Sequence, residues 1–395
     1  METRERVGRH ATQRVVPPIR RARWRAARRA ALAVLAVALV WLGWSIVPAL
    51  TAPGTDSVSA RLAEWGRLHH LGWLVTDLEK GQYSLHKPVV GGTVAGGIPT
   101  IAAANVGAGS ALPPRPSATA PAPLVPPAIV PPVAHPLPGE GRWQNLLMVN
   151  GTAAAAVASV RPDSIHTSYL VSLVWMNPAL LRFTLHPGYH VPGGPLPAPD
   201  QLTSAERASV LATFNSGFQM GDANGGYWQN GTTITPLRTG AASQVLTTDG
   251  HLSVERWPGG MPGAGIAAVR QNLVPLIEGG RISPLVPNAS TDAWGATLGN
   301  RTYVWRSAIG VRPDGSVVYV IGPAMDIQTL ADIMHAAGVE TAMELDINPD
   351  WTSFITYTHP VGGQVIPHKL TATEVASAYR YLQSSSRDFV AVFPR

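Results

Sequence analysis

The sequence predicts an α+β protein whose main part, residues 142–395, is a β-rich domain with a mixed sheet and a few helices. Short apolar segments separated by Gly, Pro, Asn and Asp fill this region, as is typical of strands. A helical pattern at residues 327–337 lies between two of these segments and predicts a strand, helix, strand unit with a parallel crossover. A third observation, an uncharged apolar stretch at residues 30–50, predicts a transmembrane helix ahead of the domain.

The first 29 residues form a basic tail. They contain ten Arg and two Glu, and the rest of the chain holds 20 basic and 22 acidic residues. The basic character therefore belongs to the tail, and a nucleic-acid partner, which would need a basic face on the folded part, is not expected.

Residues 30–50 are long enough to span a bilayer. Arginines flank only the amino side, so the positive-inside rule places the N-terminus in the cytoplasm and the main domain outside, in a single-pass cell-membrane protein. The alternative is a cleaved signal peptide. The long basic region and the length of the apolar stretch favour an uncleaved signal anchor.

Residues 51–106 are expected to form a juxtamembrane helix, at 56–79, and a loop. Residues 107–141 contain eleven prolines and predict an extended linker that holds the domain away from the bilayer without packing against it. The chain has no cysteine, which excludes disulfides and thiol catalysis.

Within the domain, two helices are predicted from their capping residues, at 203–211 and 327–337. Gly338 is expected to end the second helix. The predicted strands are 145–151, 167–176, 180–186, 209–218, 243–250, 251–257, 267–278, 298–311, 316–322 and 340–347.

The last of these strands carries two carboxylates, Glu344 and Asp346, in an otherwise apolar run. Alternation places both on the face of Ala342, with Met343 and Leu345 on the opposite face. Because unpaired carboxylates are costly to bury, either this face opens into a polar cleft or cations pair with the carboxylates in a structural network.

A second candidate cluster lies at the end of the strand near residue 214. Asn215 and Ser216 are able to offer amide and hydroxyl groups to a ligand, and Gly217 permits a close approach of backbone. The alternative is an ordinary turn, for which these residue types are also typical.

Aromatic and basic residues supply the remaining candidates. Tyr227 and Trp228 suit stacking against a sugar ring and Arg238 suits an anion, with a surface hairpin as the alternative. Arg306 leads into an apolar strand and needs a counter-charge, either a substrate phosphate or the Glu344 and Asp346 pair.

Several kinds of site are not predicted. No phosphate loop of the Walker type occurs, so nucleotide binding is not expected. The histidines lack zinc-site spacing, so no metal site and no cofactor are predicted, with a divalent-cation requirement left open.

The order of these motifs resembles the phosphodiester glycosidase family. The motifs are the turn at Asn215, Thr248-Asp-Gly250, Arg306-Ser-Ala-Ile-Gly310, the Asp314-Gly315 turn, the helix, and Ala342-Met-Glu-Leu-Asp346. The resemblance covers roughly residues 211–353 and implies hydrolysis of the bond between a sugar's anomeric carbon and a phosphodiester. It also implies functional roles for Asn215, Arg306 and Asp346.

The chain departs from the family pattern after Asp346. The family usually continues with a glycine run and Ser, whereas this chain continues with Ile347-Asn-Pro-Asp-Trp-Thr-Ser353. Glycines allow backbone amides to approach a phosphate, and Pro349 removes one donor. The loop is therefore expected to be reshaped.

Two functions follow as hypotheses. The first is a membrane-anchored extracytoplasmic hydrolase of sugar-phosphodiester linkages in envelope glycans, with Asp346 as general acid or base and Glu344 or Asp350 as its carboxylate partner. In it, Arg306 and Arg238 neutralise the phosphate. The second is a non-catalytic glycan-binding or scaffolding module on the same fold, which the altered loop motivates.

Overall fold

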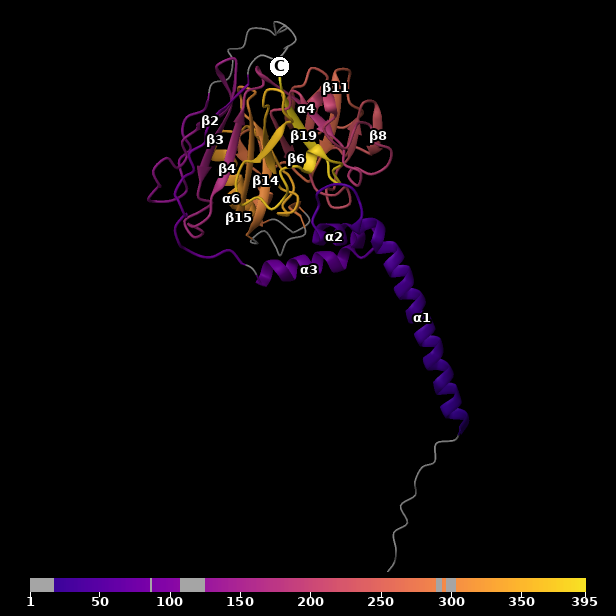
Figure 1. The fold of residues 1–395 in the computed structure, drawn as a ribbon. Helices are drawn as coiled ribbons and strands as arrows, with labels where there is room; N and C mark the ends of the chain where they lie inside the picture. Colours follow the sequence, from indigo (N-terminus) through magenta and orange to yellow (C-terminus); the bar gives the residue numbers. More distant parts are fainter. Residues whose placement is uncertain (1–17, 86, 107–124, 289–292, 296–302) are drawn as a thin grey trace, which may run out of the picture. The chain divides into compact units, whose positions relative to one another are not determined.

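The computed structural model describes residues 18–85, 87–106, 125–288, 293–295 and 303–395. The chain divides into two units, Met1–Ala52 and Pro53–Arg395. Helix α1 belongs to the first unit, and all other helices and strands belong to the second (Figure 1).

Helix α1, Pro18–Leu50, contains the expected membrane segment. Among the described residues, Arg23–Leu50 is the one helical stretch long and apolar enough to cross a membrane, and a signal sequence would pass the same test. Its apolar side chains, among them Leu39 and Val40, are exposed, as a lipid-facing helix requires.

The region expected to hold one helix at 56–79 instead forms two, α2 (Val58–Leu68) and α3 (Gly72–Leu85). The expectation was wrong because the chain turns at His70, which adopts a left-handed φ of 62°. The two helices pack side by side (Figure 1). A Cβ added to Gly66 would lie 2.9 Å from Val75, so glycine permits this close packing. We call α2 and α3 together the α2–α3 hairpin.

The largest sheet has nine strands in the order β1-β2-β3-β4-β15-β14-β16-β12-β13. It is mixed, because β1 pairs in parallel with β2 and the other pairs are antiparallel. Its strands are β1 (Ala104–Val106), β2 (Gln144–Val149), β3 (Thr152–Val160), β4 (Val171–Met176), β15 (Val317–Met325), β14 (Val304–Val311), β16 (Thr341–Glu344), β12 (Ile277–Glu278) and β13 (Arg281–Ile282).

Two five-stranded antiparallel sheets complete the domain. One has the order β18-β17-β6-β19-β5, with β18 (Ile366–Lys369), β17 (Phe354–Thr358), β6 (Ala212–Asn215), β19 (Phe389–Pro394) and β5 (Leu181–His186). The other has the order β10-β9-β11-β7-β8, with β10 (Leu252–Arg256), β9 (Ala242–Thr247), β11 (Ile266–Gln271), β7 (Tyr227–Gln229) and β8 (Thr232–Thr235). The predicted β-rich α+β class is confirmed.

The predicted strand, helix, strand unit is present. Helix α6, Ile327–Ala336, begins after Asp326, whose side chain accepts a hydrogen bond from the Thr329 amide at 2.7 Å. Strands β15 and β16 are both antiparallel to β14, which lies between them, so they run parallel to each other. The helix expected at 203–211 is shorter, α4 (Ser204–Arg207), and keeps its capping box. Helix α5 (Leu285–Asn288) and the 3₁₀ helix η2 (Arg380–Leu382) are the other short helices.

The alternation predicted around Asp346 is confirmed by the packing. Met343 and Leu345 belong to one hydrophobic cluster and Ala342 to another, on the opposite side of the strand. Several strands were not predicted, among them β17, β18, β19 and β3, and β3 was missed because its sequence is mainly alanine. Small side chains suit β3 because almost all residues of this strand are buried between close-packed neighbours.

Part of the proline-rich segment packs against the domain. Ile129 is buried, its amide binds the carbonyl of Gly141 at 2.9 Å, and Glu140 forms an ion pair with Arg161 at 2.9 Å. The expectation of an unpacked linker is therefore wrong for residues 125–141, because Ile129 belongs to a hydrophobic cluster of the domain. Residues 107–124 lie outside the described residues.

Candidate functional site

A small cavity lies where the chain leaves β16. Its volume is about 80 Å³. We call it the Asp346 pocket, and its walls are Arg67, Thr76, Glu79, Phe218, Gln219, Asp222, Gly295, Asp346, Ile347, Asn348, Trp351 and Arg387. Asp346, two residues beyond the strand, is 5% exposed. Polar and charged side chains therefore gather at the carboxyl end of an apolar strand.

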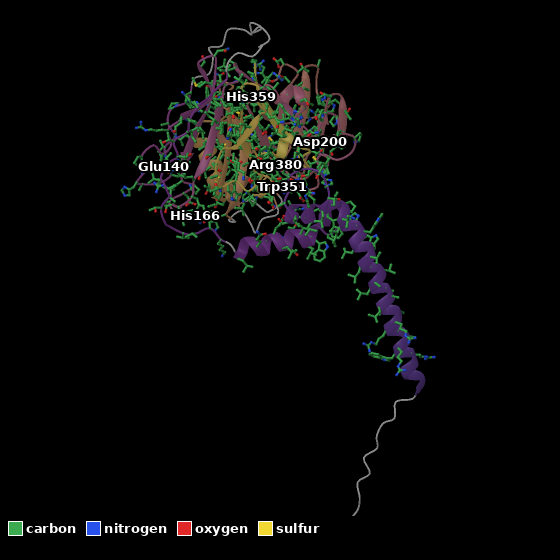
Figure 2. All side chains as sticks on the ribbon, viewed as in Figure 1. Glu140, His166, Asp200, Trp351, His359 and Arg380 are labelled. Atoms are coloured by element: carbon green, nitrogen blue, oxygen red, sulfur yellow. The ribbon has the colours of Figure 1, made fainter. Side chains whose placement is uncertain are left out.

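The Arg387 guanidinium connects Asp346 of this pocket with a second carboxylate, Glu64, which does not line the pocket. Its Nη1 lies 3.6 Å from Oδ2 of Asp346, and its Nη2 lies 2.5 Å from Oε1 of Glu64 on helix α2. Nε of Arg387 also donates to Oε1 of Glu64 at 2.8 Å. The guanidinium lies over the Trp351 ring at 4.4 Å, which orients its planar face. Trp351 also neighbours Arg380, as Figure 2 shows.

The pKa values of the two carboxyl groups are shifted in opposite directions. Burial raises the pKa of Asp346 to about 6, because Arg387 at 3.6 Å offsets only part of the desolvation. Burial also opposes ionisation of Glu64, but the close contact with Arg387 and the hydrogen bond from Gln219 outweigh it and lower the pKa of Glu64. Near neutral pH, Asp346 is thus able to hold or release a proton while Glu64 stays ionised.

The loop after Asp346 positions this carboxyl group through side-chain turns. Oδ1 of Asp346 accepts the amide of Asn348 at 3.0 Å, and Oδ1 of Asn348 accepts the amide of Asp350 at 2.9 Å. The Asn348-Pro-Asp350 sequence thus provides a defined turn where the family pattern has glycines. One oxygen of Asp346 is held by the loop and the other faces Arg387.

The α2–α3 hairpin closes the pocket. Arg67 and Glu79 line it and pair with each other at 2.8 Å, and Nδ2 of Asn348 donates to Glu79 at 3.3 Å. Before α2, Ser57 donates to Asp350 at 3.4 Å. The juxtamembrane region thus supplies part of the site, which the sequence did not indicate.

Glu344 and Arg306, both predicted at the site, form an ion pair in the interior. Both side chains are fully buried, and Nε of Arg306 also donates to the carbonyl of Met325 at 2.9 Å. Neither residue lines the Asp346 pocket. The pair matches the structural network that the sequence left open, and a catalytic role of Glu344 stays a prediction that the pocket does not support.

Asn215 and Ser216 are buried as well. Asn215 donates to Ser307 at 2.9 Å and accepts from Tyr319 at 2.6 Å, and Ser216 donates to Gln244 at 3.2 Å. Their side chains connect neighbouring strands and do not line the Asp346 pocket.

The close approach predicted at Gly217 occurs. A Cβ there would lie 2.9 Å from Asn272 Oδ1 and 3.1 Å from Cζ of Arg270, so the neighbours are protein side chains. Arg270 itself pairs with Asp388 at 2.6 Å, both fully buried. Gly217 thus makes room for this buried pair.

The aromatic cluster forms the hairpin that was the alternative interpretation, β7 and β8. Tyr227 is fully buried, Trp228 is 8% exposed, and neither lines the pocket. Arg238 is exposed and binds Asn224. Asp350 is half-buried beside the pocket, where its carbonyl accepts from Arg380 at 3.0 Å. Of the predicted site residues, Asp346 alone lines the pocket.

Sequence reasoning missed Arg387, Glu64, Arg67, Glu79 and Asn348. One signal for Arg387 was available: Arg387-Asp388 leads into the apolar run of β19, in the same way that Arg306 leads into an apolar strand. The hairpin residues gave no such signal, because only the tertiary contacts bring them to Asp346.

Within the described ranges, no cluster of three or more His, Asp or Glu side chains is arranged to hold a metal ion. Arg67 and Arg387 of the pocket are instead paired with carboxylates, Arg67 with Glu79 and Arg387 with Asp346 and Glu64. This donor set fits an anionic ligand bound by Arg387.

The fold and site thus define a β-rich domain with an acid and an arginine in one pocket. Residues 207–346 match the family model of the phosphodiester glycosidases, which confirms the resemblance over this stretch. The matched stretch ends at Asp346, so Arg387 and the α2–α3 hairpin lie outside it. No curated protein matches the chain significantly.

Fourteen chains of solved structures match this chain, among them the following three. The catalytic domain of zebrafish N-acetylglucosamine-1-phosphodiester alpha-N-acetylglucosaminidase, auto-inhibited by its pro-peptide, is 14% identical, with a TM-score of 0.39 over 61% of this chain and 82% of that one. A hypothetical protein from Synechocystis is 14% identical, with a TM-score of 0.32 over 62% and 63%. A putative exported protein from Burkholderia pseudomallei is 12% identical, with a TM-score of 0.22 over 57% and 74%.

Proposed function

We propose that this protein is a hydrolase of sugar phosphodiesters in which Asp346 is the general acid and Arg387 binds the phosphate. The observation that carries the proposal is the pairing of a raised-pKa carboxyl with a guanidinium in one pocket. The family match of residues 207–346 supports the reaction class.

In the reaction, water attacks the anomeric carbon, the bond from this carbon to the phosphate oxygen breaks, and the proton that the attacking water loses passes to the solvent. Asp346, protonated because burial raises its pKa, gives its proton to the departing oxygen, and the products are a free sugar and a phosphate monoester. Arg387 neutralises the phosphate, for which its planar fork is well suited.

Substrate binding requires the α2–α3 hairpin to move so that the Asp346 pocket becomes larger. Pockets for small-molecule ligands are commonly about 300–1,000 Å³, several times the roughly 80 Å³ found here. Glu64 also occupies the face of Arg387 that a phosphate would use. The substrate anion therefore replaces Glu64 on Arg387 as the hairpin shifts.

We also propose that α1 is a single-pass anchor with the basic tail in the cytoplasm, so that the site lies outside the cytoplasm, where envelope glycans are the available substrates. The arginine flank on the amino side of the apolar helix supports this orientation. Protease added to intact spheroplasts should digest residues 53–395 and spare a tag on the N-terminus. Protection of the domain would reverse the orientation.

The test of activity uses the full chain in detergent, because the hairpin is part of the site. We expect release of N-acetylglucosamine from an N-acetylglucosamine-1-phosphodiester, reduced about 10²- to 10⁴-fold by Asp346→Asn. Asp332→Asn, on α6 and outside the pocket, is the matched control and should keep full activity.

No release by the wild type, or equal release by Asp346→Asn, would refute this mechanism. Binding of envelope polysaccharide without turnover would instead favour the glycan-binding module. The glycine-free loop and the closed pocket are the observations in favour of that second function.

A further inference from the structure

The α2–α3 hairpin has an inverted distribution of side chains. Its inward side carries charged residues, with Glu64 3% exposed and paired with Arg387. Its outward side carries large apolar residues, and Trp73, Leu78 and Val58 are 66%, 66% and 65% exposed. A helix facing water normally shows the opposite pattern, so this outward side is matched to a non-aqueous neighbour.

The exposed apolar residues form helical stripes. Leu74, Leu78 and Leu85 on α3 are four and seven residues apart, and Val58 and Leu62 on α2 are four apart. Such spacings place side chains on one face of a helix.

The position of the hairpin in the chain identifies the neighbour. Only residues 51–57 separate α1, which ends at Leu50, from α2, which begins at Val58. At full extension these seven residues span about 25 Å, so the start of the hairpin stays within this distance of the end of α1. A bilayer surface is thus within reach of these stripes whatever else the protein binds.

The net charge of the hairpin and its residue types also suit a bilayer surface. Residues 58–85 contain three Arg or Lys and three Asp or Glu, which cancel, so attraction to this surface is apolar. Asp77 and Lys80 of α3, 3.6 Å apart and partly exposed, are of the polar types that suit the headgroup region of a bilayer. Trp73 is of the residue type that prefers this boundary.

We propose that the apolar face of the α2–α3 hairpin docks on the outer leaflet of the membrane that α1 crosses. The proposal rests on the anchoring role given to α1 above and is independent of the hydrolase chemistry. The same hairpin carries a wall of the Asp346 pocket on its other side, so docking places this pocket about one helix diameter, roughly 10 Å, from the lipid.

The experiment uses the cysteine-free full chain, in which one added cysteine takes one spin label. Labels at Leu74→Cys, Leu78→Cys and Val58→Cys are measured in phosphatidylcholine nanodiscs for collision with oxygen and with a water-soluble nickel chelate. We expect the collision rate of the label with oxygen to exceed its collision rate with the nickel chelate several-fold at all three positions. Val361→Cys, fully exposed between β17 and β18, is the matched control and should favour nickel.

A label at Leu39→Cys on α1 separates the possible failures. If this label is in lipid while the hairpin labels favour nickel, the docking proposal is overturned and the anchor stands. If the Leu39 label favours nickel, the anchor itself fails, and docking fails with it. Spin–spin broadening between hairpin labels of two copies would overturn docking in favour of self-association. Replacing half of the lipid with phosphatidylglycerol should change the oxygen-to-nickel collision ratios of the hairpin labels by less than twofold, because the hairpin has no net charge.

Discussion

Two arginine–carboxylate pairs have carboxylates only two residues apart in the chain, Glu344 and Asp346, but differ in what surrounds them. Arg306 and Glu344 are both fully buried, whereas Arg387 and Asp346 line a cavity. Glu344 ends β16, and Asp346 already belongs to the loop. The contrast teaches that an acid becomes available for chemistry where its strand ends, because within the sheet both faces are covered.

The largest expected effect tests the interior pair. Arg306→Met leaves Glu344 buried without its cation, so at pH 8 we expect the free energy of unfolding to fall by about 3–5 kcal/mol in urea titrations. Arg256→Met, which breaks the half-exposed pair with Glu278, is the matched control and should cost at most about 1 kcal/mol. Equal losses would mean that the interior pair is not structural.

The second prediction concerns the pH dependence of stability. Burial raises the pKa of Glu344 from 4.5 to about 7, and that of Asp346 from 3.8 to about 6. Between about pH 4 and pH 7 the folded state therefore binds more protons than the unfolded state, and stability falls as pH rises, by roughly 3 kcal/mol for each group.

The measurement is urea unfolding at pH 4.5, 6 and 7.5 for the wild type and for Glu344→Gln with Asp346→Asn. The double variant should show the flatter profile, because it lacks both titrating groups. Parallel profiles would show that the two carboxyls have ordinary pKa values in the folded protein.

The third prediction tests the pocket pair. Arg387→Lys keeps the charge but loses the fork, so we expect KM for the sugar phosphodiester to rise about tenfold with a smaller change in kcat. Arg256→Lys, remote from the pocket, should leave KM unchanged. An unchanged KM in Arg387→Lys would remove Arg387 from the phosphate site.

The smallest expected effect is on the pH dependence of kcat/KM, which distinguishes the role of Asp346 from that of Glu344. If Asp346 must be protonated, kcat/KM falls about tenfold per pH unit above about pH 6. Glu344→Gln should retain this profile, because Glu344 lies outside the pocket. A profile that changes with Glu344 and not with Asp346 would exchange the roles of the two residues.

The sequence was most informative where local periodicity decides the structure. Alternation around Asp346 and the caps of α6 are set by neighbouring residues, and both were predicted. Strand β3 was missed because an alanine run carries no strand period, and only the packing of neighbouring strands selects it.

The site was harder to predict because it is assembled from distant segments. Asp346 was found from its own strand, but its partner Arg387 lies 41 positions further along, and Glu64 is 323 positions from Arg387. The sequence also gave no means to separate Glu344 from Asp346, since both fit the same face. Their difference lies in the tertiary surroundings, because Arg306 pairs with Glu344 in the interior whereas Asp346 lines the pocket.

The contact between Glu64 and Arg387 has a consequence for biosynthesis. A ribosome makes the hairpin long before it makes Arg387, so the nascent chain carries an ionised Glu64 that has no guanidinium to meet. At about 5–20 residues per second, that interval lasts roughly 15–65 seconds. The Glu64–Arg387 ion pair therefore cannot form, and the Asp346 pocket stays incomplete, in nascent chains that have not yet reached Arg387.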